Sequence, residues 1–179
     1  MDSITLEKIT YKNYIKVIWG LKVSKKQKNF VASNSNSLAE AYVAITNKGV
    51  ALPFAICKNG KPIGFLMIGY GLAEGDDLEN EDPEFVEIVR KSYSVWRLMI
   101  DKRYQGKGYG RKAMELALGY IRTFPCGGAD LCWLSYEPEN EAAKKLYASF
   151  GFVELPQFYN GNEGEEIPAI LKLWVLYFR

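Results

Sequence analysis

The chain has 179 residues, of which 48% are hydrophobic, and its 23 basic and 21 acidic side chains leave a net charge of +2. This length and composition favour a single domain spanning residues 1–179 with a sizeable core. The sequence contains no histidine, which excludes an imidazole base, a Ser-His triad and a His-ligated metal.

The charge and the apolar pattern also restrict where the protein acts. A nearly balanced charge argues against a nucleic-acid partner. No apolar run approaches the roughly 18 residues of a membrane span, and the N-terminus lacks the pattern of a signal peptide. We expect a soluble cytoplasmic protein with no membrane partner. Cys57, Cys126 and Cys132 lack metal-ligand spacing, so we interpret them as buried free thiols and expect no metal site.

The N-terminal part predicts a strand followed by two helices. Residues 3–9 alternate as a strand does, and residues 11–21 have helical spacing. The apolar side chains expected to face inward from this helix are Tyr14, Ile15, Ile18 and Trp19.

A basic, polar loop is expected over residues 22–36. Ser37 and Glu40 have the spacing of a capping box, which predicts that a second helix begins there. The same pattern predicts that this helix runs to Lys48 and is stopped by Gly49.

The next segment predicts a hairpin and then an acidic loop. Residues 54–58 and 62–70 flank Asn59-Gly60, a pair that favours a two-residue turn with positive φ. Residues 74–87 hold eight carboxylates and no cation, with a short helix expected over residues 84–91. A second acidic cluster consists of Glu163, Glu165 and Glu166.

The middle of the chain predicts an anion-binding turn. An apolar strand over residues 95–100 leads into glycines 106, 108 and 110, and a helix is expected over residues 111–123. Backbone N–H groups in such a turn point at an anion, with the positive end of the helix dipole behind them. The spacing fits neither a P-loop nor the dinucleotide fingerprint G-x-G-x-x-G, and a plain structural turn is an equally good interpretation of the glycines alone.

A second block, residues 131–153, predicts a strand, a turn, a helix and a strand. A connection over residues 155–166 and a last strand over residues 168–178 follow. Antiparallel strands first and then alternating strands and helices predict a mixed α/β sheet.

Together, these two blocks resemble the GNAT superfamily of acetyl-CoA-dependent N-acetyltransferases. The family's loop Q/R-x-x-G-x-G/A is met by residues 105–110, and Asn140 precedes a helix with Leu146-Tyr147 and then Gly151-Phe152. The match is close over residues 93–155. It implies six or seven strands with helices on both faces and splayed central strands, with acetyl-CoA in the wedge between them.

The resemblance also implies the residues of the site. The backbone of the fourth strand would pair with the pantetheine arm, the glycine loop would bind the pyrophosphate, and Tyr147 would donate a proton to the leaving thiolate. The residues implied for the cofactor are Leu98, Met99, Ile100, Gln105, Gly106, Lys107, Gly108, Tyr109, Gly110, Arg111 and Asn140. Core packing for Leu98 and Ile100, a helix cap for Asn140 and a buried aromatic for Tyr147 are the structural alternatives.

The acceptor must be a neutral amine, so a base or a water chain is required. Tyr136, Glu137 and the carboxylates of residues 74–87 are candidates, because Trp96-Arg97 stands where eukaryotic-type spermidine/spermine acetyltransferases carry an acidic pair.

The acidic run and the resemblance to bacterial polyamine N-acetyltransferases predict a small amine substrate such as spermidine or spermine. Aminoglycosides, protein or peptide amines, and a non-catalytic CoA sensor are the alternatives. A homodimer is implied by resemblance only. The aromatic residues available to line an acceptor pocket are Tyr11, Trp19, Tyr70, Phe85, Trp96, Phe158 and Tyr159.

Overall fold

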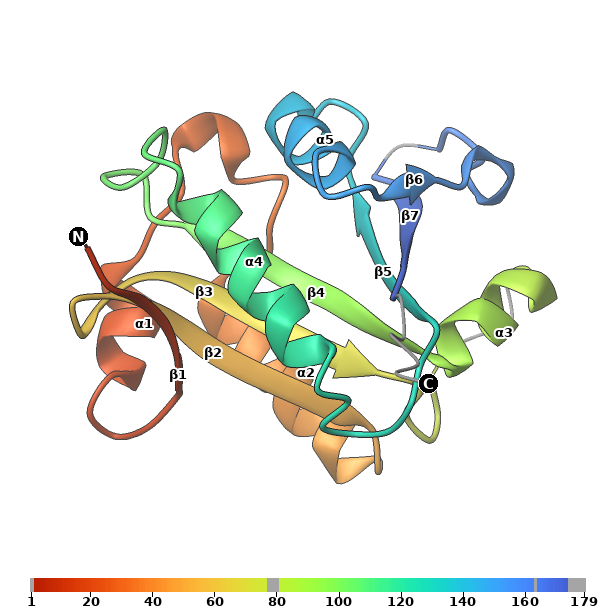
Figure 1. Cartoon of the computed structure of the whole chain (residues 1–179), viewed down its shortest axis with the longest axis horizontal. Helices are drawn as coiled ribbons and strands as arrows, with labels where there is room; N and C mark the ends of the chain where they lie inside the picture. Colours follow the sequence, from red (N-terminus) through yellow and green to blue (C-terminus); the bar gives the residue numbers. More distant parts are fainter. Residues whose placement is uncertain (1, 77–80, 163, 174–179) are drawn as a thin grey trace, which may run out of the picture.

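The structure, a computed structural model, describes residues 2–76, 81–162 and 164–173. Within them lies a seven-stranded sheet with the order β1-β2-β3-β4-β5-β7-β6 (Figure 1). The strands are β1 Ile4–Lys8, β2 Val50–Lys58, β3 Lys61–Tyr70, β4 Ser92–Ile100, β5 Leu131–Tyr136, β6 Val153–Glu154 and β7 Ile167–Lys172. The α-helices are α1 Tyr14–Gly20, α2 Asn34–Thr46, α3 Pro83–Arg90, α4 Tyr109–Ile121 and α5 Glu141–Ala148, with 3-10 turns at Lys25–Gln27 and Pro156–Phe158.

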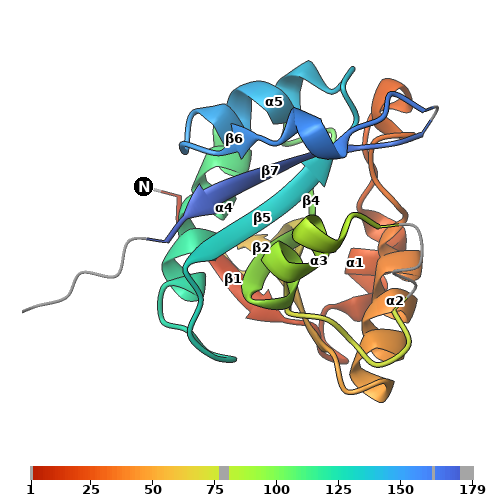
Figure 2. The ribbon, with the colours of Figure 1, turned by 90° about the vertical axis from the view of Figure 1, so that its right-hand side faces the viewer.

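Helices cover both faces of the sheet, as expected. Helix α4 crosses one face, and α1 and α2 lie behind the other (Figures 1 and 2). Each face has its own core: Met114 and Ile121 of α4 pack with Leu66 on one side, whereas Val17 of α1 and Phe65 of β3 belong to the cluster on the other. Alternating side chains of β3 serve both cores, which explains why this strand is a nearly continuous apolar run.

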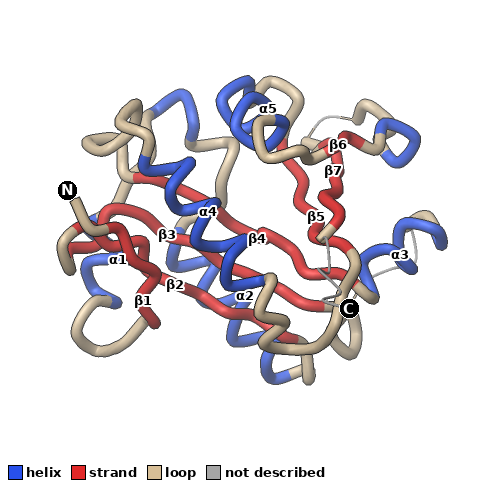
Figure 3. The backbone as a smooth tube through the Cα atoms, viewed as in Figure 1, coloured by secondary structure: helices blue, strands red, loops and turns tan. Residues whose placement is uncertain are grey.

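The two central strands pair only at one end. β4 and β5 are parallel, and their register joins only residues 92–94 to residues 131–133. Beyond this point β5 diverges from β4 while it remains paired with β7 (Figure 3). The mixed sheet and the splayed central strands predicted from the sequence are confirmed.

The hairpin between β2 and β3 is also confirmed. Asn59 and Gly60 form its turn with φ of 49° and 75°, the left-handed backbone that this residue pair tolerates. A β-bulge follows in β4, where Arg97 pairs with Met67 and Val95 with Ile68. Trp96 is therefore the extra residue, and the bulge turns the strand at the point where it leaves β5.

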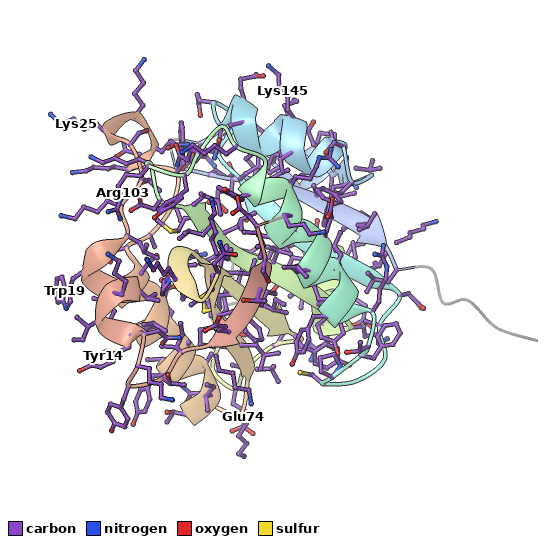
Figure 4. All side chains as sticks on the ribbon, turned by 60° about the vertical axis from the view of Figure 1, so that its left-hand side comes forward. Tyr14, Trp19, Lys25, Glu74, Arg103 and Lys145 are labelled. Atoms are coloured by element: carbon purple, nitrogen blue, oxygen red, sulfur yellow. The ribbon has the colours of Figure 1, made fainter. Side chains whose placement is uncertain are left out.

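The inward face predicted for the first helix is wrong for Tyr14, Ile15 and Trp19, whereas Ile18 is half-buried. Val17 is fully buried, whereas Tyr14, Ile15 and Trp19 are 37%, 53% and 69% exposed. Figure 4 shows Tyr14 and Trp19 pointing away from the sheet. The helix is only seven residues long and begins at Tyr14 rather than Tyr11, so its contact with the sheet is narrower than the apolar pattern suggests.

The predicted start of the second helix is wrong as well. Ser33 caps α2 by accepting a hydrogen bond from the backbone N–H of Asn36 (3.2 Å). Ser37 lies inside the helix and is buried. At the other end, Lys48 rather than Gly49 takes the left-handed conformation, with φ of 58°.

The remaining elements follow the predictions within a few residues. The last strand ends at Lys172, and residues 174–178 of the expected strand lie outside the described residues. Residues 77–80 of the acidic run lie outside them too. All three cysteines are free, with Cys57 and Cys132 buried. Among the described helices, none has the length and apolarity required to cross a membrane.

Candidate active site

A cavity of about 520 Å³ occupies the gap between β4 and β5. One wall is residues 95–100 of β4, and the other is formed by the end of β5 and by α5. The glycine loop closes one end, and residues 29–32, which precede α2, also line the cavity. The basic loop expected over residues 22–36 therefore contributes to this cavity, which the sequence did not suggest.

The edge of β4 that lines the cavity has backbone groups that do not pair with β3. Asp101 N–H donates to Ile63 O on β3 (2.8 Å), so the alternation of an antiparallel pair turns the backbone groups of Leu98 and Ile100 away from β3. Gln105 Nε2 donates to Ile100 O (2.8 Å), which agrees with this direction. Met99 also borders the cavity, but the same alternation directs its N–H and C=O toward β3.

The glycine loop ends in a helix N-terminus that has no side-chain cap. Gly106 and Gly108 have φ of 71° and 78°, a backbone that glycine adopts without strain. Gly108 is the N-cap of α4, and no side chain of the described residues caps this helix. Gly110 lies within that first turn rather than in the loop. The first N–H groups of α4 are therefore available to an anion.

The two cations of this segment are directed elsewhere. Lys107 Nζ donates to Arg103 O (3.0 Å), and Arg111 Nη2 donates to Ser149 Oγ (2.6 Å). Neither residue belongs to the cavity lining. The cradle consequently depends on the backbone and the helix dipole, and the predicted contribution of these two side chains is not seen in this arrangement.

A buried carboxylate fixes the start of the loop. Asp101 is 1% exposed and accepts hydrogen bonds from Arg103 Nε (2.7 Å) and from the backbone N–H of Lys22 (2.9 Å). Burial alone would raise the pKa of Asp101, but the hydrogen bonds and the charge of Arg103 outweigh it and lower the pKa. These bonds tie the loop to the segment that follows α1.

Asn140 and Tyr147 both line the cavity. Asn140 Oδ1 accepts from Ala143 N–H (3.2 Å), so the helix-cap role is present and leaves the Nδ2 amide group for a ligand. Tyr147 is buried beside Tyr136 and Phe152, at ring centroid distances of 5.6 and 5.9 Å. Burial, together with the negative charge of Glu166, raises the pKa of Tyr147, which keeps the phenol protonated.

A second cavity of about 420 Å³ opens where β4 and β5 separate. Aromatic side chains from four segments line it, together with carboxylates from the acidic run and from the loop before β7. These residues are Tyr70, Phe85, Trp96, Trp133, Asp76, Glu81 and Glu166. Of the aromatic residues proposed for an acceptor pocket, Tyr11, Trp19, Phe158 and Tyr159 do not line this cavity. Tyr11 and Trp19 are largely exposed on the α1 side.

Five residues line both cavities and mark their junction: Val95, Trp96, Arg97, Ser135 and Glu166. The charge of Arg97 is offset by Glu40, whose carboxylate lies 3.1 Å from Nη2. Sequence reasoning missed Ser135 altogether and noted Glu166 only as part of an acidic cluster. No local pattern identifies them, because the pairing of β5 with β7 brings them together.

Two of the predicted bases are poorly placed. The Tyr136 hydroxyl donates to Glu154 (2.6 Å), and burial together with that carboxylate raises its pKa, so it stays protonated. Burial and the charges of Glu166 and Glu139 raise the pKa of Glu137, but Glu137 lines neither cavity. Within the described ranges, no group of three or more metal-ligating side chains is present.

An open strand edge beside an uncapped helix N-terminus fits a ligand that carries both amides and phosphates, such as coenzyme A, and so indicates the class of coenzyme A-dependent acyltransferases. Residues 25–152 match the model of the acetyltransferase (GNAT) family. The chain belongs to this family and is an acetyl-CoA-dependent N-acetyltransferase.

A relative with an assigned activity supports the same class. The chain is 31% identical over 153 residues to a spermine/spermidine N(1)-acetyltransferase of Bacillus subtilis, a match that covers 84% of this chain and 88% of the relative.

Solved structures share the fold. An aminoglycoside acetyltransferase AAC(6')-Ib in complex with coenzyme A superimposes with a TM-score of 0.71 at 17% identity, over 95% of each chain. Spermidine N-acetyltransferase from Vibrio cholerae, in complex with CoA and spermine, superimposes with a TM-score of 0.63 at 18% identity, also over 95% of each chain.

Proposed function

We propose that this enzyme acetylates a primary amine of a polyamine such as spermidine or spermine. The observation that carries the proposal is the second cavity, where carboxylates and aromatic faces meet at the open end of the sheet. Carboxylates attract ammonium groups, and aromatic faces accept cations and pack against the methylene segments between them. The relative from Bacillus subtilis supports this class of acceptor.

Acetyl-CoA supplies the acetyl group as a thioester. The backbone of Leu98 and the N–H of Ile100 would hold the amides of the pantetheine arm, whereas the C=O of Ile100 already accepts from Gln105 Nε2. Asn140 Nδ2 would add a donor from the opposite wall. The first turn of α4, together with Gly106 and Gly108, would receive the pyrophosphate. Arg111 contributes its backbone N–H to that turn, and Lys107 would have to leave Arg103 O to add its charge.

Tyr147 is the proposed general acid. Tyr147 lines the first cavity, called the donor cavity below, and its hydroxyl donates no hydrogen bond to any described residue, so it would be free to protonate a sulfur atom. Its raised pKa keeps the proton in place until negative charge develops beside it.

The same cavity favours aminoglycosides as a second candidate acceptor, because they also present several ammonium groups on a framework that stacks against aromatic rings. The two classes differ in shape: a polyamine is a thin chain, whereas an aminoglycoside is a set of linked rings. A direct comparison of turnover separates them.

The test uses purified full-length protein and labelled acetyl-CoA with spermidine, spermine, putrescine, an aminoglycoside and a peptide as acceptors. We expect kcat/KM to be highest for spermidine or spermine. Good turnover of another amine without turnover of any polyamine would refute this acceptor and leave the class of enzyme intact. Binding of CoA without turnover of any amine would favour the sensor alternative.

A further inference from the structure

Glu166 lies at the junction of the donor cavity and the second cavity, which is called the acceptor cavity below. It lines both of them, as does Ser135 on the facing strand. The Ser135 hydroxyl donates to Glu166 Oε2. The antiparallel register of β5 and β7, which pairs Ser135 with Pro168 and Tyr136 with Ile167, holds the two side chains at this position.

The negative charge of Glu166 affects titratable groups at and near the donor cavity. Its negative charge contributes to the raised pKa of Tyr147 from α5 and of Glu137 at the end of β5. The other charged or titratable groups around the junction are Arg97 of β4, Tyr136 of β5, and Asp76 and Glu81 of the segment before α3. Arg97 already has Glu40 as its partner at 3.1 Å, and Glu166 is exposed.

Among the five residues that line both cavities, Glu166 is the one carboxylate. The two alternative bases are less suitable, because Tyr136 donates to Glu154 and Glu137 lines neither cavity. Asp76 and Glu81 line only the second cavity, farther along the acceptor's route. Of the described carboxylates, Glu166 is therefore the one that lines both cavities.

We propose that Glu166 is the general base that removes the proton from the acceptor ammonium, and that Ser135 is a positioning residue that orients its carboxylate. This inference rests on the proposed function, because it requires an amine acceptor in the second cavity. It assigns a role to the acidic cluster before the last strand, which the polyamine proposal leaves unexplained.

The proton transfers balance. An N–H bond of the ammonium breaks, its electron pair stays on nitrogen, and an O–H bond forms on Glu166. The nitrogen then bonds to the acetyl carbon as the carbon–sulfur bond breaks, and the Tyr147 hydroxyl gives its proton to sulfur. Of the two protons that nitrogen loses in total, one restores Tyr147, and the other leaves Glu166 for solvent.

The test compares wild type with Glu166→Gln and a matched control, Glu139→Gln, over a series of pH values with spermidine as acceptor. Glu139 is exposed, lines neither cavity and carries the same charge. We expect Glu166→Gln to lower kcat/KM about 10²- to 10⁴-fold near neutral pH, whereas Glu139→Gln retains wild-type turnover. Thermal unfolding of both variants checks that they are folded.

The pH dependence distinguishes a base from a structural contact. Without the base, only acceptor that is already neutral can react, and this fraction grows about tenfold per pH unit up to an amine pKa of about 10. The loss of kcat/KM in Glu166→Gln relative to wild type is therefore expected to shrink as pH rises. The raised pKa of Tyr147 keeps the general acid protonated over this range. Ser135→Ala should show a smaller defect with the same trend.

A defect that is equal at every pH, or one confined to KM, would overturn the assignment and make Glu166 a binding or structural residue. If wild type acetylates another amine and no polyamine, the same comparison is made with that amine, so the acceptor and the base are tested separately. Absence of turnover with every amine would overturn both proposals.

Discussion

At the scale of single residues, the site is decided by which polar groups are already engaged. Tyr136 and Tyr147 lie side by side, yet only Tyr136 has a carboxylate partner, Glu154. Lys107 and Arg111 belong to the glycine motif but bind Arg103 O and Ser149 Oγ. A residue's place in a motif therefore does not settle whether its side chain is free to act.

Tyr147 provides the first prediction at this scale. Tyr147→Phe should lower kcat by about 10- to 10⁴-fold, because the leaving sulfur loses its proton donor. The Kd for acetyl-CoA should change little, since the ring still fills the buried space. Steady-state kinetics and calorimetric titration measure the two quantities.

The control for this variant is Tyr120→Phe. Tyr120 lies on α4, where its ring packs against Phe54 at a centroid distance of 5.4 Å, and it lines neither cavity. Unchanged kcat in Tyr147→Phe would remove the general-acid role. An equal loss in both variants would point to a general effect of removing a phenol.

At the scale of elements, helix ends were the features least predictable from the sequence. Ser37 and Glu40 have the spacing of a capping box, but Ser33 caps α2. Glu40 instead bonds to Asn36 and pairs with Arg97 of β4. Several serines and asparagines at positions 33–37 all offer plausible caps, and packing against the sheet selects among them.

Ser33 and Ser37 give the second prediction, because replacing each of them by alanine should change the free energy of unfolding differently. Ser33→Ala should lower the free energy of unfolding by about 0.5 to 2 kcal/mol, because the Asn36 N–H loses its acceptor. Ser37→Ala should leave stability unchanged or raise it, since the buried Ser37 hydroxyl has no partner among the described residues. Denaturant unfolding of both variants measures the difference, and a larger loss for Ser37→Ala would contradict the observed helix start.

The start of α4 gives a third prediction. Gly108→Ala places a side chain at φ of 78°, where no neighbouring atom lies within 4 Å of the new Cβ. The expected cost is therefore the backbone conformation alone, about 1 to 2 kcal/mol. That cost should appear as lower stability or, if the loop rearranges, as weaker acetyl-CoA binding.

Gly119→Ala is the matched control on the same helix. Gly119 lies within α4, and its added Cβ also meets nothing within 4 Å. This variant should be stabilised by about 0.5 to 1 kcal/mol, because alanine is the better helix former. A stabilised Gly108→Ala variant with normal acetyl-CoA affinity would refute the need for a left-handed residue in the loop.

At the scale of the whole molecule, Asp101 connects segments that are distant in sequence. Its carboxylate joins the end of β4 to the backbone of Lys22, and Arg103 extends the network to Gly20 O (2.8 Å). Arg103 is half exposed and Asp101 nearly buried. The start of the glycine loop is therefore held against the segment that follows α1 by this buried carboxylate, together with the backbone hydrogen bond from Lys102 N–H to Lys22 O (2.9 Å).

The pH dependence of this connection is the fourth prediction. The folded-state pKa of Asp101 is lowered below its ordinary value of 3.8, so its stabilisation is complete above that value and is lost as the pH falls through the folded pKa. Asp101→Asn should lower the free energy of unfolding by about 1.5 to 3 kcal/mol at neutral pH. The gap in Tm from wild type should narrow below about pH 4, and a gap independent of pH would contradict this account.

The sequence determined the features that depend on local chemistry. The hairpin at Asn59-Gly60, the turn of Gly106 and Gly108 before α4, and the helix that presents Tyr147 follow from backbone preferences and apolar spacing among residues close along the chain. The tertiary structure alone decided which side chains face the cavities. Ser135 and Glu166 meet only because β5 pairs with β7, and α1 buries Val17 rather than Trp19 because of how it packs on the sheet. Contacts between distant segments leave no local pattern, so the glycine turn could be predicted from its motif, whereas the meeting of Ser135 and Glu166 could not.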